Sequence, residues 1–194
     1  MKLKLTILAL ALGATSALYA QTASYHLDPM HSEADFTIQH MAISSVHGQF
    51  SDITGSIVLD PNNMSHSSVE ATIPVNTINT GVAARDKHLR SDDFFAAEKY
   101  PTMSFKSTSV KADPGGYQVV GNLTLHGVTR PVTLQMDPLG PTIELQGKEH
   151  RGFAATTSLN RRDFGLLWNG LLPGGDAMIG NKVQITLSVE AIKQ

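Results

Sequence analysis

The residues most able to do chemistry lie close together in one segment, residues 85–95. Its polar groups are Arg85, Asp86, Lys87, His88, Arg90, Asp92 and Asp93. Unpaired charge is too costly to bury, so this segment must be either a solvated helix or a paired network near a mouth or cavity. In the functional interpretation, a ligand's polar head would be met by Arg85, Asp86, His88 and Asp92. The alternative is a structural ion-pair network that closes one end of the fold.

The sequence around this segment predicts β-strands. Apolar and polar residues alternate in several runs, including residues 34–40, 69–75, 132–136 and 183–191, which is typical of strands with one face in a core or cavity. Turn signals rich in proline, glycine, aspartate and asparagine separate the runs. Many short strands with such regular punctuation predict an antiparallel sandwich or a closed barrel.

The alternation stops between Gly81 and Pro101, where residues 82–91 have the composition of a helix. A second short helix is expected from Asp92 or Asp93 to Glu98, because aspartates favour a helix N-terminus. A helical insertion between two barrel strands would lie over one end of the barrel. Residues 165–180 contain several glycines and a proline, and we expect a long loop that carries the single tryptophan, Trp168.

The first twenty residues predict a secretory signal peptide. Lys2 and Lys4 precede an apolar run from Leu5 to Leu18, which is too short for a membrane-spanning helix of roughly 20 residues. We expect cleavage after Ala20, with a cut after Ala17 as the alternative, so residues 1–20 would be the signal peptide and residues 21–194 a single binding domain. The mature protein would then be periplasmic or secreted.

Composition and motifs argue against several functions. A net charge of -2 gives no electrostatic basis for binding nucleic acid. The histidines are scattered without the short spacing typical of metal sites, so we expect no metal and no required cofactor. There is no cysteine, no nucleophile elbow and no phosphate-binding glycine loop, so no catalytic residue is assigned.

Eight segments share their sequence and their order with one known family: residues 27–32, 36–40, 48–50, 85–95, 98–105, 121–129, 160–165 and 183–190. Together they resemble the YceI-like family of lipocalin-like, polyisoprenoid-binding proteins. Two positions depart from the family's pattern: Tyr25 stands where tryptophan is frequent, and Ala96 where an acidic residue is common. The resemblance implies an all-β fold, an antiparallel barrel of about eight strands with a short helical insertion over one end.

The resemblance also implies a non-enzymatic function, the carriage or storage of a long-chain amphipathic lipid inside the barrel. The lipid would be a polyisoprenoid or an isoprenoid quinone precursor, although other long-chain lipids fit equally well. His31 and His40 are further candidates for polar contacts. The expected apolar lining consists of Phe36, Ile38, Ile73, Met103, Phe105, Leu125, Leu134, Phe153 and Trp168.

Two other classes of function remain open at this stage. The first is an enzyme acting on a lipid or small hydrophobic substrate, with His88 and either Asp86 or Asp92 as acid and base. The second is a stress-related interaction protein whose cavity is incidental. Transient membrane contact during lipid exchange and a homodimer are further expectations of the lipid-binding hypothesis.

Overall fold

The computed structural model describes residues 22–194, so the predicted signal peptide lies outside the described residues. The strands are β1 (Ala23–Leu27), β2 (Glu33–His40), β3 (Ser44–Phe50), β4 (Thr54–Leu59), β5 (Ser68–Pro74), β6 (Thr102–Asp113), β7 (Gly116–Leu125), β8 (Val128–Met136), β9 (Thr142–Leu145), β10 (Lys148–Asn160) and β11 (Ile179–Lys193). The helical elements are α1 (Ala83–Arg90) and the short 3-10 helices η1 (Met64–His66), η2 (Val75–Thr77) and η3 (Arg161–Phe164). Within the described range, no helix is long and apolar enough to cross a membrane.

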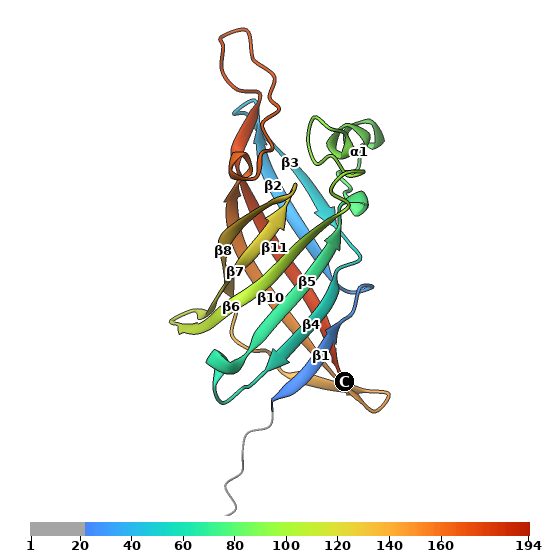
Figure 1. Ribbon diagram of the computed structural model, residues 1–194, viewed down its shortest axis with the longest axis vertical. Coiled ribbons are helices and arrows are strands. Elements are labelled where there is room, and N and C mark those ends of the chain that lie inside the picture. Colours follow the sequence, from blue (N-terminus) through green and yellow to red (C-terminus); the bar gives the residue numbers. More distant parts are fainter. Residues whose placement is uncertain (1–21) are drawn as a thin grey trace, which may run out of the picture.

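Eight antiparallel strands close into a barrel (Figure 1). The ring runs β11, β1, β4, β5, β6, β7, β8 and β10, and β10 pairs with β11 to complete it. The β10–β11 ladder extends from the pair of His150 with Ile192 to the pair of Asn160 with Lys182. Closure gives each of these strands a partner on both sides, but the β8–β10 ladder is short, with Met136 paired to Ala155 and Gln135 to Thr156. The predicted barrel of about eight strands is confirmed.

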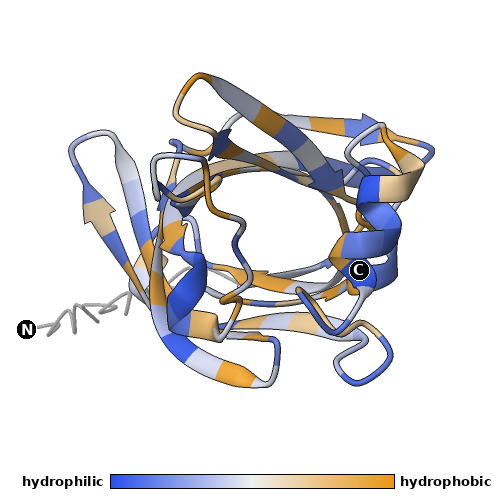
Figure 2. Ribbon diagram, turned by 90° about the horizontal axis from the view of Figure 1, so that it is seen from above, coloured by the Kyte–Doolittle hydropathy of each residue, from blue (hydrophilic) through white to orange (hydrophobic). Residues whose placement is uncertain are grey.

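The β2–β3 hairpin extends the wall at one end of the ring. β1 and β2 pair with β11 one after the other, β1 near Ala191 and β2 from Ser188 to Ile179. Gln49 in β3 then bonds through its backbone with Asn79, in the segment that precedes α1. The hairpin and the α1 segment therefore border the same end of the barrel, which we call the mouth (Figures 1 and 2).

The predicted first helix is confirmed as α1, and the second is wrong. Residues 91–99 form successive turns instead, with Ala96 in a left-handed conformation at φ 45°. The amides of Phe95 and Ala97 donate to the carbonyls of Leu89 and Arg90, back onto the end of α1. This folding back replaces the helical ladder and keeps the segment over the mouth.

Candidate functional site

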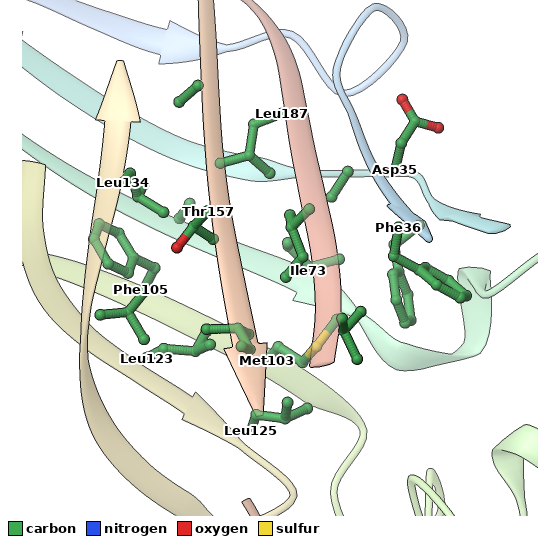
Figure 3. Close-up of a pocket in the computed structure, with 18 of the residues that line it drawn as sticks. Asp35, Phe36, Ile73, Met103, Phe105, Leu123, Leu125, Leu134, Thr157 and Leu187 are labelled. Atoms are coloured by element: carbon green, nitrogen blue, oxygen red, sulfur yellow. The ribbon is translucent and has the colours of Figure 1, made fainter. Parts of the chain in front are cut away.

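The barrel encloses a cavity of about 700 Å³ whose wall is largely hydrocarbon (Figure 3). It reaches from α1 and Trp168 at the mouth to Leu59 and η1 at the opposite end. The volume falls within the range of roughly 300–1,000 Å³ typical of small-molecule pockets. All the apolar side chains expected to line a ligand lie along this wall: Phe36, Ile38, Ile73, Met103, Phe105, Leu125, Leu134, Phe153 and Trp168. Their contact with a ligand stays a prediction.

Strand alternation explains why these residues share the cavity. On β10 every second side chain lines it, at Phe153, Ala155, Thr157 and Leu159, because successive side chains of a strand point to opposite faces. The intervening residues are exposed outside. Thr157 is polar, and its hydroxyl is satisfied by donating to the carbonyl oxygen of Thr133 at 2.8 Å.

Two glycines make room for the aromatic rings of the wall. A Cβ at Gly48 would lie 2.5 Å from the Phe36 ring, and one at Gly121 would lie 2.4 Å from the Phe105 ring. Real Cβ atoms do not approach other carbons so closely. The end of each ring therefore occupies the space beside its glycine that a larger residue's side chain would fill.

Some side chains of the charged segment line the cavity, and others bond the chain just before α1. Arg85 lines the cavity, while its Nε and Nη2 donate to the hydroxyl and carbonyl oxygens of Thr80, at 2.7 and 2.8 Å. Asp86 is buried and does not line the cavity; its Oδ1 accepts from the Thr80 amide at 2.9 Å and from the Thr80 hydroxyl. Asp86 therefore fits the structural interpretation better than a head-group role. Arg85 fits both, because it lines the cavity and also holds Thr80.

His88 lies where α1 meets the long loop. Its ring lines the cavity and stands edge-on to both Phe94 and Trp168, at 5.1 Å between ring centroids in each case. Its Nε2 lies 2.8 Å from Oδ2 of Asp93, so the carboxylate beside it is neither Asp86 nor Asp92. The predicted loop is confirmed over residues 165–178, where the structure has only one isolated bridge.

The other predicted polar contacts are scattered. His40, at the mouth end of β2, lines the cavity, whereas Asp92 is exposed and does not. His31 lies in the exposed connection between β1 and β2, where its Nδ1 is 2.7 Å from Asp28. The structure therefore brings Arg85, His88 and His40 to the cavity and leaves Asp86, Asp92 and His31 outside it.

Asp28, His31 and Glu190 form the one group of potential metal ligands among residues 22–194, with ligand atoms within 4.8 Å of one another. Each of these side chains already has a protein partner, since His31 bonds Asp28 and Glu190 bonds His150 at 2.7 Å. The group therefore gives no reason to assign an ion, and the absence of a metal stays a prediction.

Arg161 is the buried, charged cavity residue that sequence reasoning missed as a candidate for the site. It follows β10, lines the cavity and is only 4% exposed. Its Nε donates to the carbonyl of Gly180 at 2.9 Å, and its Nη1 donates to those of Leu166 and Trp168, both at 2.7 Å. Its Nη2 is buried without a partner among the described residues. Burial, helped by the charge of Arg162, lowers the pKa of the Arg161 guanidinium from its ordinary value.

A second polar cluster lies at the end of the barrel away from the mouth. Tyr25 and Glu149 lie on the faces of β1 and β10 that carry cavity-lining residues further along, and the Tyr25 hydroxyl donates to Glu149. Lys193 also donates to Glu149, at 3.4 Å. Burial and the neighbouring carboxylate raise the pKa of Tyr25, so the phenol keeps its proton as a donor. We call this cluster of Tyr25, Glu149 and Lys193 the floor.

A closed antiparallel barrel around an apolar cavity defines a lipocalin-like fold. The chain belongs to the YceI-like family, because the model of the YceI-like domain matches residues 25–191. A UPF0312 protein of Pseudomonas paraeruginosa is 41% identical over 99% of this chain and 100% of its own length.

Solved structures agree with the fold. A YCEI protein of Campylobacter jejuni is similar at 30% identity with a TM-score of 0.66, over 80% of this chain and 90% of that one. A polyisoprenoid binding domain from Saccharophagus degradans is similar at 18% identity with a TM-score of 0.59, over 89% of this chain and 99% of that one. This second likeness concerns the fold alone.

Proposed function

We propose that this protein binds a long-chain amphipathic lipid in its barrel and carries or stores it without chemical change. The observation that carries the proposal is the apolar cavity, which runs from the mouth to Leu59 and η1 at the opposite end of the barrel. Membership of the YceI-like family and the likeness to a polyisoprenoid binding domain support a polyisoprenoid as the first candidate.

The apolar wall of the cavity favours a ligand with a long hydrocarbon chain. Burying one methylene group contributes about 0.8 kcal/mol, so ten such groups contribute roughly 8 kcal/mol before the entropic cost of binding. Polar groups would then be needed for orientation rather than for affinity. This agrees with a wall that carries few charged side chains, Asp35, Arg85 and Arg161.

Binding without catalysis is the better interpretation of the polar residues. The acid and base of the alternative, His88 with Asp86 or Asp92, would need a shared site. Asp86 instead turns back to Thr80, and Asp92 lies outside the cavity. The remaining pair of His88 and Asp93 is exposed at the rim, where solvent competes with any substrate.

Transient membrane contact belongs to the same proposal. Ile43 and Leu171 are exposed hydrophobic residues, 82% and 71% accessible. The turn that carries Ile43 and the loop that carries Leu171 lie together, because the Met41 amide donates to the Met178 carbonyl at 2.7 Å (Figure 1). Replacing both exposed residues with serine should reduce flotation with phosphatidylglycerol vesicles, whereas unchanged flotation would contradict membrane contact.

Mass spectrometry of lipids extracted from protein purified from its own host tests the function. We expect one class of long-chain lipid in near-stoichiometric amount. In an Ala155→Trp variant, where the indole fills the cavity, the lipid should be lost. Thr156→Trp is the matched control, because Thr156 is the exposed neighbour on the outer face of β10. Equal lipid in both variants, or no lipid in the unaltered protein, would overturn the proposal.

A further inference from the structure

The guanidinium of Arg161 is a buried cation without an acidic partner. It takes part in no salt bridge among residues 22–194. Asp35 is the one acidic residue of the cavity wall among residues 22–194. Its carboxylate points to the opposite side of β2 from the ring of Phe36 (Figure 3). Because a buried charge without a counter-charge is costly, an anion that reaches it binds more tightly than a neutral group.

The hydrogen bonds of Arg161 identify the atom that such an anion would meet. A guanidinium has five N–H donors, and three of them serve the carbonyls of Gly180, Leu166 and Trp168. Both N–H groups of Nη2 remain unpaired. Carboxylate and phosphate oxygens are the acceptors that arginine suits best.

Arg85, the other arginine in the cavity wall, already bonds other groups of the protein. Arg85 donates from Nε and Nη2 to Thr80 and lies beside the carboxylate of Asp86, which bonds the same threonine. Arg85 therefore has a counter-charge close by on its own helix, and Arg161 has none. The difference singles out Arg161 as the anion site.

We propose that Arg161 binds the anionic head group of the lipid, a carboxylate or a phosphate, while the tail extends toward the floor at Tyr25. This inference rests on the proposed function and adds the class of head group and the orientation of the chain. β10 ends at Asn160 on the side of the barrel where α1 lies (Figure 1). The head therefore lies beneath the mouth.

Matched pairs of lipids test the head group on delipidated protein at pH 7.5, with the fluorescence of the single tryptophan, Trp168, as the signal. Hexadecanoate is compared with hexadecanol, and farnesyl phosphate with farnesol; the two pairs separate a carboxylate site from a phosphate site. A charge-assisted hydrogen bond makes the anion of at least one pair bind roughly tenfold to a hundredfold more tightly than its alcohol. Equal binding within both pairs overturns the inference alone. No binding by any of the four lipids overturns the proposed function with it.

Variants show whether Arg161 causes the preference. Arg161→Gln should reduce the ratio of anion to alcohol affinity to near one and leave the alcohol affinity within a few-fold, and Arg161→Lys should retain part of the ratio. Arg162→Gln is the matched control, because it removes the neighbouring, exposed positive charge. A ratio that survives in Arg161→Gln overturns the inference. So does an equal loss of anion and alcohol binding, which is the result expected if Arg161 only holds the loop.

A measurement on the unaltered protein keeps the test valid even if Arg161→Gln fails to fold. The carboxyl carbon of bound [1-¹³C]hexadecanoate reports its ionisation by NMR. A head group paired with a guanidinium should titrate at or below the ordinary carboxyl pKa of about 4.3. A carboxyl buried without a cation would titrate well above that value, and that result overturns the inference.

Discussion

The indole ring of Trp168 stands edge-on to the imidazole ring of His88, with 5.1 Å between centroids and an interplanar angle of 88°. Phe94 joins both rings, at 5.0 Å from Trp168. This contact connects α1 and the turns after it with the loop of residues 165–178, so two excursions of the chain meet across the mouth. All three rings line the cavity, so a ligand that leaves between α1 and the loop would pass them.

Trp168→Ala should speed the release of bound lipid. Aromatic contacts of this kind contribute about 0.5–1.5 kcal/mol, so we expect a rate increase of roughly two- to tenfold. Stopped-flow transfer of a dansyl-labelled fatty acid to excess vesicles measures it. Leu167→Ala is the control, since Leu167 is an exposed neighbour on the same loop. Identical rates in the two variants would refute a gating role for the ring contact.

Asp86→Ala should destabilise the delipidated protein by about 2 kcal/mol, because it removes the buried acceptor of the Thr80 amide and hydroxyl. Asp92→Ala, at an exposed position of the same segment, should change stability by about 0.5 kcal/mol or less. Thermal melts are compared without lipid, because bound lipid would itself raise the melting temperature. Equal melting temperatures would show that Asp86 has no structural role.

Truncation of the cavity wall should cost less than truncation of the packed core. Ile78 is fully buried outside the cavity, and Ile78→Ala should cost about 3 kcal/mol. Leu134 faces existing empty space, so Leu134→Ala adds little new void and should cost about 1 kcal/mol. Urea unfolding of delipidated variants gives both values. The reverse order would mean that the barrel collapses when it is empty.

The pair of Asp28 and His31 should respond to pH and salt. The hydrogen bond from His31, with that from the Met30 amide, lowers the pKa of Asp28, and the bond to Asp28 raises the pKa of His31. The stabilisation that His31 contributes to the folded state is therefore complete below the unfolded histidine pKa of about 6.5 and is lost as pH rises through the raised pKa. The stabilisation that Asp28 contributes is lost as pH falls through its lowered pKa.

An NMR titration checks this pair. In Asp28→Asn the pKa of His31 should return toward about 6.5. High salt should shrink the shift in the unaltered protein, because the imidazole is exposed. A His31 pKa that Asp28→Asn leaves raised would assign the shift to another group.

Local patterns in the sequence were enough to predict the strands and α1. The alternation of Phe36 with Ile38, and of Val183 with Ile185, reports a strand with one buried face, and the family's motifs indicate the barrel. The turns after α1 could not be predicted, because Ala96 adopts its left-handed conformation to satisfy amides that fold back onto Leu89 and Arg90. Composition carries no signal for that contact.

The polar site was harder to predict because it depends on partners far apart in the chain. Trp168 meets His88 only when the loop and α1 converge at the mouth. Arg161 looks like one half of an ordinary basic pair with Arg162. Only the folded chain shows that Arg161 points inward to three carbonyls while Arg162 is exposed. The alternation of β10 was the available signal, since Arg161 continues the inward series of Phe153, Ala155, Thr157 and Leu159.

The hydrogen bond between Tyr25 and Glu149 places a row of polar groups on three neighbouring strands, β1, β11 and β10, at the end of the barrel away from the mouth. An apolar tail leaving on that side would have to strip water from these groups, which is costly. The mouth is then the easier route both in and out, so a lipid donor and a lipid acceptor would use the same opening in turn. A tail longer than the cavity would leave its excess projecting there.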